Sequence, residues 1–367
     1  MQLLDSPQSQ LLTSAPVRVL DCLQDIANNI QLQSNFCISH PAYKPFEIPA
    51  EAVTRFQRTP LDLQNKYLSL QLQSFLYGIY YNGSMQAALA VDASATDVAL
   101  HQNLENNTFL GVDLEFYERL HKSNSGEGYF DPDWSILRQE SDGSLAVKKG
   151  GLTLHIEREK HLQQTQQSAT VGDSVAIRMP RNFVQNGFYM AVSNAGSDTH
   201  PQTVRVYFNL TPEGAVAVME SLTRQLNETK IPFTFKVLYN LSDYGRYDSG
   251  VLYFEKSNYE IVRQVLRSVY VENESHFRPE VPLFTKLLAP GLALAEEPDC
   301  KFAAVESFGM NRCQIVANGL LEARATGDES TEYRMACIHQ HFSVLGIDWQ
   351  RAYLNANSED IYTLLYL

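Results

Sequence analysis

Hydrophobic and polar residues alternate along three segments in the middle of the chain, and this alternation predicts three β-strands. The segments span residues 204–209, 233–240 and 246–254. Successive side chains of a strand point to opposite faces of a sheet. One face is therefore expected to be apolar and aromatic, and the other to carry Arg205, Tyr207, Asn209 and Lys236. Such a polar face can bind a phosphate or a carboxylate, although a solvated sheet face would show the same alternation.

Helical periodicity predicts that the first third of the chain is mainly helical. Apolar residues recur every three or four positions over residues 17–34, from about residue 60 to residue 81, and over 97–121. A small, polar run at 123–128 then breaks the pattern, as linkers do. We therefore expect a helical N-terminal region, residues 1–125, followed by a second domain, residues 126–367.

Short strand-like runs and helices alternate beyond this boundary. The runs before the three central strands span 134–138, 144–148, 151–156, 174–178 and 187–193, and helices are expected over 211–228, 256–271, 311–325 and 332–344. The expected fold class is α+β, with the helical N-terminal region followed by a mixed, largely antiparallel sheet flanked by helices.

Composition narrows the classes of function. A net charge of −13 argues against nucleic acid as a partner. No apolar run approaches the roughly 20 residues that span a bilayer, and residues 1–13 lack the basic and apolar parts of a signal peptide. The five cysteines are scattered and form no CxxC pair, which favours neither disulfides nor a zinc site. We therefore expect a cytoplasmic protein with no membrane partner.

Several isolated charges are candidates for a binding site. The chain has no phosphate-binding glycine loop and no common hydrolase, protease or kinase motif. Lys286 and Arg312 lie in apolar or small surroundings, where a charge needs a partner or a ligand. Arg246 and Asp248 either form a surface ion pair or belong to the polar site. The histidines show no spacing that favours a metal ion.

The motifs around these residues resemble the HopA family of type III effectors. They are the segments 187–189, 205–209, 235–237, 246–248, 284–286, 289–292, 295–298, 307–309 and 312–313. The resemblance covers roughly residues 125–340. It is strongest to bacterial homologues in peptide-biosynthesis clusters, such as the lyase partner of class V lanthipeptide synthesis. The chain shows no recognisable effector secretion segment, and this favours the biosynthetic branch.

The resemblance implies a lyase that eliminates phosphate from phosphoserine or phosphothreonine in a precursor peptide, giving dehydroalanine or dehydrobutyrine. A separate peptide kinase would install the phosphate, and neither a metal nor another cofactor is implied. Two alternatives stay open. One is a noncatalytic module that binds a phosphopeptide or a leader peptide, and the other is an effector-like protein-interaction domain.

Elimination of phosphate requires a base for the α-proton, cations for the leaving group and a donor for the charge that develops on the carbonyl. Lys236 is the expected base, because neighbouring cations and partial burial favour the neutral amine. Tyr207 or Tyr247 is expected to donate a hydrogen bond or a proton. The expected phosphate ligands are Arg205, Arg246, Lys286 and Arg312, and the expected supporting residues are Asn209, Asp248 and Tyr189.

Overall fold

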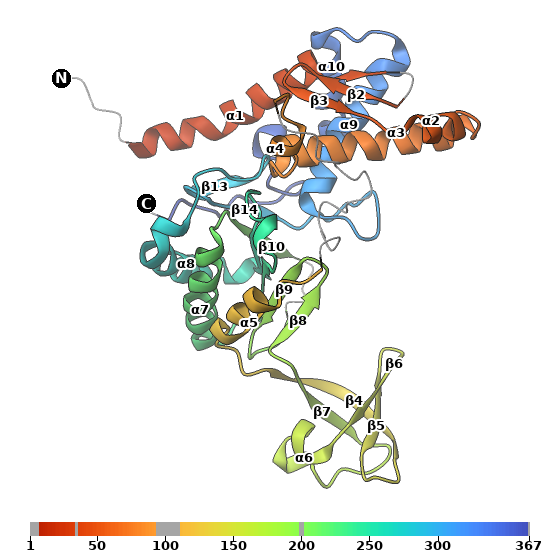
Figure 1. Cartoon of the computed structure of the whole chain (residues 1–367). Coiled ribbons are helices and arrows are strands. Elements are labelled where there is room, and N and C mark those ends of the chain that lie inside the picture. Colours follow the sequence, from red (N-terminus) through yellow and green to blue (C-terminus); the bar gives the residue numbers. More distant parts are fainter. Residues whose placement is uncertain (1–6, 34–35, 93–110, 198–201, 366–367) are drawn as a thin grey trace, which may run out of the picture.

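A seven-stranded antiparallel sheet forms the centre of the molecule (Figure 1). The computed structural model describes residues 7–33, 36–92, 111–197 and 202–365. The strands of the central sheet are β8 (Asn182–Gln185), β9 (Phe188–Val192), β10 (Thr203–Phe208), β11 (Thr234–Leu238), β12 (Gly250–Glu255), β13 (Lys286–Ala289) and β14 (Leu292–Glu296). Their order is β13-β14-β10-β12-β11-β9-β8. The three strands predicted from alternation lie side by side in its middle, and the α+β class is confirmed.

One face of the central sheet is covered by helices α5 (Leu114–Ser123), α7 (Pro212–Thr229) and α8 (Tyr259–Asn273) (Figure 1). The local sequence explains where α7 begins, because the Thr211 side chain accepts a hydrogen bond from the Gly214 N–H and Pro212 fills the first turn. Val204, Val206 and Phe208 of β10 are buried in the hydrophobic core. The apolar half of the predicted alternation therefore forms the core-facing side of this strand.

A helical layer covers much of the other face and combines helices from the first and last thirds of the chain. It contains α1 (Pro7–Asn29), α2 (Ala50–Phe56), α3 (Leu61–Leu76), the π-helical segment η1 (Tyr77–Tyr81), α4 (Gln86–Leu89), α9 (Phe308–Thr326) and α10 (Thr331–Val344). Helix α9 packs against both α3 and α10. Across the described ranges, no helix is long and apolar enough to cross a membrane.

Most of the predicted helices are confirmed with shifted ends. The first ends at Asn29, not at residue 34, because Gln31 and Leu32 form β1, which pairs with β2 (Ile38–His40), itself paired with β3 (Tyr43–Phe46). The helix expected over 97–121 lies mostly outside the described residues, and its described part is α5.

A separate four-stranded sheet extends from one end of the molecule (Figure 1). Its strands are β4 (Tyr129–Gln139), β5 (Leu145–Lys149), β6 (Leu152–Ile156) and β7 (Ser174–Met179), in the order β6-β5-β4-β7. It has its own small core around Trp134, Ile136 and Val147. The division into residues 1–125 and 126–367 stays a prediction. Helices α9 and α10, which belong to the second of these ranges, pack with the N-terminal helices.

Candidate functional site

An open pocket of about 440 Å³ lies on the polar face of the central sheet. Its residues on the sheet strands are Gln185, Met190, Thr203, Arg205, Thr234, Lys236 and Tyr253, and the rest of its lining is Glu297, Lys301, Ala304, Val305, Glu306 and Ser307. The segment 301–307, which leads into α9, therefore forms the wall opposite the sheet. The prediction that Arg205 and Lys236 share one face is confirmed.

The strand register brings these two cations together. Arg205 of β10 and Thr234 of β11 both pair with Tyr253 of β12, so the three residues form one row across the sheet. Lys236 lies two residues beyond Thr234 and therefore on the same face. Residues far apart in the sequence thus line one pocket because three antiparallel strands are in register.

Both cations lie against the same aromatic ring. The Arg205 Cζ atom is 5.1 Å from the centroid of the Tyr253 ring, and the Lys236 Nζ atom is 5.5 Å from it. Lys236 Nζ is also 4.5 Å from the centroid of Phe188, and it donates a hydrogen bond to Gln185 Oε1 at 3.3 Å. Two aromatic rings and a neutral amide oxygen therefore surround the Lys236 amine.

Glu297 links Arg205 to a third cation, Lys301. Its Oε2 accepts a hydrogen bond from Arg205 Nε, and its Oε1 accepts one from Lys301 Nζ at 2.5 Å. Burial raises the pKa of the Glu297 carboxyl, but Arg205 and Lys301 outweigh this effect and hold the pKa below its usual value. Glu297 is therefore ionised at neutral pH and aligns two cations along one side of the pocket.

Tyr207 and Asn209 share the face of Arg205 but do not line the pocket. The Tyr207 ring packs edge-to-face against Tyr81, with ring centroids 6.3 Å apart, and burial raises the pKa of its hydroxyl. Asn209 Nδ2 donates to the backbone oxygen of Glu280. The helical layer covers this part of the sheet, so the prediction that these two residues act in the site is wrong about their position.

Arg246 and Asp248 form a buried ion pair beside the pocket, and Arg246, a predicted phosphate ligand, does not line the pocket. Arg246 Nε lies 2.5 Å from Asp248 Oδ1, and Nη2 lies 2.8 Å from Oδ2. Asp248 also accepts hydrogen bonds from Asn82 Nδ2 and the Tyr77 hydroxyl, each at 3.3 Å. Burial raises the pKa of Asp248, but Arg246, Asn82 and Lys236 hold it below its usual value. The pair thus joins the helical layer to the sheet.

Lys286 holds the C-terminal segment and does not reach the pocket. Its Nζ lies 2.8 and 2.7 Å from the two carboxylate oxygens of Asp360, and it donates to the backbone oxygen of Tyr362 at 2.7 Å. The expectation that this isolated lysine needs a partner is confirmed. The expectation that the partner is a substrate phosphate is contradicted, because an acidic side chain of the C-terminal segment fills that role.

Arg312 is also a structural cation. Its side chain is 1% exposed, and it donates hydrogen bonds to the backbone oxygens of Ala352 and Leu354 and to the side chain of Asn311. Burial lowers the pKa of Arg312 to about 10, against the influence of nearby acidic residues. Because its guanidinium is enclosed by these acceptors, the prediction that it binds phosphate is wrong.

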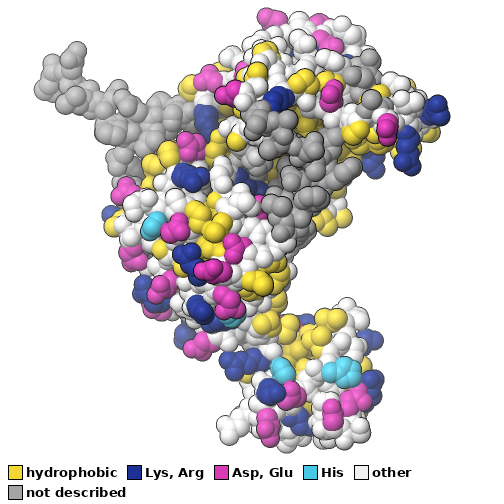
Figure 2. All heavy atoms as spheres, in the orientation of Figure 1, with side chains coloured by type: hydrophobic (Ala, Val, Ile, Leu, Met, Phe, Trp, Pro, Cys, Tyr) yellow, Lys and Arg dark blue, Asp and Glu magenta, His cyan; other side chains and the backbone are white. Residues whose placement is uncertain are grey.

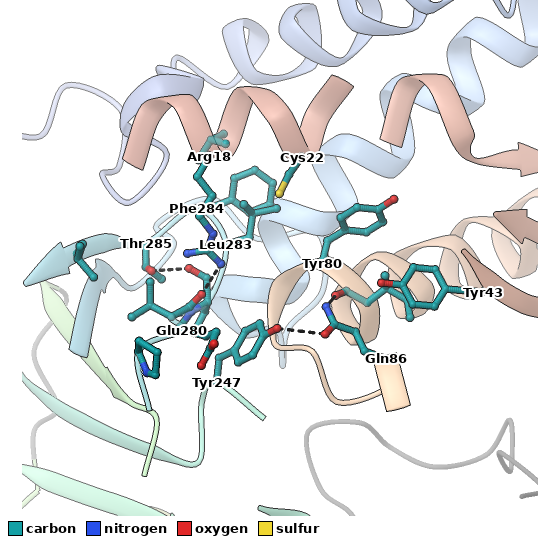
Figure 3. Close-up of a pocket in the computed structure, with 16 residues that line it drawn as sticks. Arg18, Cys22, Tyr43, Tyr80, Gln86, Tyr247, Glu280, Leu283, Phe284 and Thr285 are labelled. Atoms are coloured by element: carbon teal, nitrogen blue, oxygen red, sulfur yellow. Dashed lines mark hydrogen bonds between the residues drawn. The ribbon is translucent and has the colours of Figure 1, made fainter. Parts of the chain in front are cut away.

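Tyr189 and Tyr247 lie away from the pocket. Tyr189 is on the opposite face of the sheet, where its hydroxyl accepts a hydrogen bond from Asn124 Nδ2 at 3.0 Å. Tyr247 lines a second pocket of about 530 Å³, below α1, and its hydroxyl donates to Gln86 Oε1 at 3.2 Å (Figure 3). The predicted donor Tyr247 and the predicted supporting residue Tyr189 therefore do not line the pocket that holds Lys236.

Lys301, Glu297 and Tyr253 are site residues that the sequence did not reveal. Tyr253 lies in a predicted strand, but its position opposite Arg205 depends on the register between two strands. Lys301 lies in an irregular segment with no periodicity. The four-residue spacing between Glu297 and Lys301 was the available signal, although such spacing is usually interpreted as a helical pair.

One family model and two solved structures are similar to parts of this chain. No curated protein sequence matches the chain. Two solved structures that match are effector proteins of Pseudomonas syringae. The effector of pv. tomato strain DC3000 is 16% identical with a TM-score of 0.42, covering 80% of this chain and 96% of its own. The effector of pv. syringae strain 61 is 14% identical with a TM-score of 0.45, covering 93% and 99%. Residues 179–354, which contain the whole lining of the site pocket, match the HopA1 effector protein family.

Proposed function

We propose that this protein is a phosphoserine or phosphothreonine lyase that eliminates phosphate from a phosphorylated precursor peptide, giving dehydroalanine or dehydrobutyrine during lanthipeptide biosynthesis. The observation that carries the proposal is the open pocket lined by Arg205, Lys236 and Lys301. Among the described residues that line the pocket, these three cations face two carboxylates, Glu297 and Glu306, which leaves an excess of positive charge. Such a pocket suits a small anion at the end of a side chain.

Arg205 and Lys301 are suited to hold the phosphate. A guanidinium offers five N–H donors in a planar fork, and an ammonium offers three. Glu297 takes one hydrogen bond from each of them, so further donors remain for phosphate oxygens. Because Glu297 fixes both cations before the substrate arrives, little ordering of side chains is needed on binding.

Lys236 is suited to move the proton. As a neutral amine, Lys236 takes the α-proton of the phosphorylated residue, the electrons of the Cα–H bond form the Cα–Cβ double bond, and the Cβ–O bond breaks with its electron pair leaving on phosphate. The net reaction transfers the α-proton to the leaving phosphate. The ammonium that Lys236 becomes can supply that proton, so the scheme requires neither a second acid nor a cofactor.

A noncatalytic phosphopeptide-binding module is the second candidate. The observation that favours it is the stacking of Lys236 against Phe188 and Tyr253, because such contacts fix the lysine side chain as a binding group and require no proton transfer. A module of this kind would use the same cations for the phosphate and would leave the peptide unchanged.

Mass spectrometry of a phosphoserine peptide incubated with the purified protein separates these candidates. A lyase removes one phosphoric acid and leaves dehydroalanine, which adds a thiol such as 2-mercaptoethanol. A phosphatase leaves serine, which does not add the thiol, and a binding module leaves the mass unchanged. Lys236→Ala is expected to abolish the thiol adduct. Lys148→Ala, on an exposed lysine of β5, is the matched control and is expected to retain it.

A further inference from the structure

The proposed elimination requires a hydrogen-bond donor for the carbonyl oxygen of the phosphorylated residue. Removal of the α-proton places negative charge on this oxygen, and a fixed donor aimed at it lowers the barrier. The two tyrosines expected in this role do not lie in the pocket, because Tyr207 is covered by the helical layer and Tyr247 lines the second pocket. The donor therefore has to come from another side chain beside Lys236.

Gln185, the last residue of β8, lines the pocket and is hydrogen-bonded to Lys236. Its Oε1 accepts a hydrogen bond from Lys236 Nζ at 3.3 Å. Among the described residues, none accepts a hydrogen bond from Gln185 Nε2. A side-chain amide has an acceptor and a donor end, so the contact with Lys236 uses the acceptor and leaves the N–H donors for a ligand.

The β8–β9 hairpin holds Gln185 in place. Gln185 pairs with Phe188 across the hairpin, and the Phe188 ring centroid lies 4.5 Å from Lys236 Nζ. The Gly187 N–H donates to the Tyr239 hydroxyl at 3.0 Å, and the Tyr239 N–H donates to the backbone oxygen of Gly187 at 3.2 Å. A donor on an anchored hairpin needs little reorganisation when charge develops beside it.

The pocket residues lie in the order that the substrate atoms require. In the sheet, β11 with Lys236 lies between β8 with Gln185 and β10 with Arg205. In a phosphoserine residue, the α-carbon lies between the carbonyl group and the phosphate-bearing β-carbon. A substrate whose α-carbon lies at Lys236 can therefore direct its carbonyl to Gln185 and its phosphate to Arg205. Both cations contact the Tyr253 ring, so one phosphorylated side chain can lie against both.

A peptide chain has room to approach this side of the sheet. Strand β8 is the outermost strand of the central sheet, next to the four-stranded sheet (Figure 1). Figure 2 shows the surface hollowed between the four-stranded sheet and the main body.

We infer that Gln185 is a catalytic residue that donates a hydrogen bond from Nε2 to the carbonyl oxygen of the phosphorylated residue while its Oε1 holds Lys236. This inference rests on the proposed function. As the α-proton moves, Lys236 gains positive charge beside Oε1, and the carbonyl oxygen gains negative charge beside Nε2. The amide dipole of Gln185 is aligned with both charges, so it stabilises the transition state more than the bound substrate. No bond of Gln185 itself is made or broken.

Gln185→Met tests the inference, because methionine has a similar length and offers no N–H donor. For acetyl-phosphoserine methylamide, we expect kcat/KM to fall about 10²–10³-fold, the usual effect of losing one such donor. The Kd for a phosphoserine peptide is expected to stay within about threefold, because the donor acts mainly in the transition state. An unchanged Kd also shows that the variant is folded. Near-normal turnover by Gln185→Met would overturn the inference.

Two further variants control for the change of side chain. Gln185→Glu keeps the length and the acceptor for Lys236 but lacks the N–H donors, so it is expected to lose turnover as well. Near-normal turnover by this variant would also overturn the inference. Val184→Ala is the matched control on the same strand. Val184 is 63% exposed and points to the other face of the sheet, so we expect normal turnover.

A second substrate, acetyl-phosphoserine methyl ester, distinguishes a carbonyl donor from a residue that only positions Lys236. The α-proton of an ester is more acidic than that of an amide, so its removal depends less on a donor at the carbonyl. The loss of kcat/KM in Gln185→Met is therefore expected to be about tenfold smaller for the ester than for the methylamide. Equal losses for the two substrates would indicate a positioning role and would overturn the inference.

The outcomes separate this inference from the proposed function. Elimination by the unaltered protein, with near-normal turnover by Gln185→Met, would support the lyase and overturn the role of Gln185. Absence of elimination by the unaltered protein would overturn both.

Discussion

The buried pair of Arg246 and Asp248 gives a prediction that separates a structural cation from a phosphate ligand. Their side chains are 5% and 6% exposed, and two hydrogen bonds join them. Removal of one partner of a buried ion pair typically costs about 3–5 kcal/mol, because the other charge is left without compensation. In Arg246→Ala, Asp248 keeps its hydrogen bonds from Asn82 and Tyr77. We therefore expect the free energy of unfolding to fall by about 3 kcal/mol, the lower end of this range.

Denaturant unfolding followed by circular dichroism measures this loss, and a double-mutant cycle isolates the pair. Arg246→Met combined with Asp248→Asn is expected to cost less than the sum of the single changes, with a coupling energy of about 1–3 kcal/mol. Arg351→Ala is the control, because its partner Asp348 is 43% exposed, and we expect a change below about 1 kcal/mol. The structural assignment would be refuted if Arg246→Ala retained full stability and lost phosphopeptide binding.

The pH dependence of stability provides a second check on the same pair. The pKa of Asp248 is lower in the folded protein than the ordinary carboxyl value of 3.8. A depressed carboxyl pKa stabilises the fold fully above the unfolded-state value, and this contribution disappears as the pH falls through the folded-state pKa. When the pH falls from neutral to below about 4, the free energy of unfolding is therefore expected to fall less in Asp248→Asn than in the unaltered protein. Parallel acid-unfolding curves would contradict this assignment.

Three further predictions concern the other cations. Lys236→Ala is expected to lower the elimination rate by about 10²–10⁴-fold in a mass assay, the usual contribution of a general base, while phosphopeptide binding persists. Near-normal phosphate release by this variant would exclude Lys236 as the base. Arg205→Ala is expected to weaken binding of a phosphorylated peptide by about 2 kcal/mol in calorimetry, as the loss of charged hydrogen bonds would, without changing binding of the unphosphorylated peptide. Equal losses for both peptides would indicate a structural role. Lys286→Ala is expected to lower the Tm, because Asp360 loses its partner, and to leave the phosphopeptide Kd unchanged. A raised Kd with an unchanged Tm would indicate that Lys286 binds the phosphopeptide.

The alternation of polar and apolar residues predicted those features of the site that depend on a single strand. It identified the segments that form β10, β11 and β12, and it assigned Arg205 and Lys236 to the polar face. Period-two alternation specifies a face only relative to the strand itself. Tyr189 shows the limit, since its strand was predicted but its face depends on the register with β11.

The structural cations could not be identified because their partners lie far away in the sequence. Lys286 pairs with Asp360, and Arg312 donates to backbone oxygens at residues 352 and 354. An isolated charge in an apolar segment signals that a partner is needed. The sequence does not say whether the C-terminal segment or a ligand supplies that partner.

For the fold as well, the sequence predicted individual elements but not how they assemble. Helices α3 and α7 carry apolar stripes, and α7 also has a capping Thr211; these are local signals, and both helices appear where the periodicity indicated. The separation of β4–β7 into a sheet with its own core was not predicted, although all four of its strands were. Assembly of strands into one sheet or two depends on contacts between segments, and periodicity within a segment carries no such information.

A phosphoserine peptide that carries deuterium at the α-carbon tests the central claim most directly. Elimination breaks the Cα–H bond and the Cβ–O bond in one reaction, so the product is expected to lose phosphate and the deuteron together. Lys236→Ala is expected to leave both in place. Loss of phosphate with the deuteron retained would indicate hydrolysis, and retention of both by the unaltered protein would indicate a binding module. Either result would contradict the assignment of this pocket as the active site of a lyase.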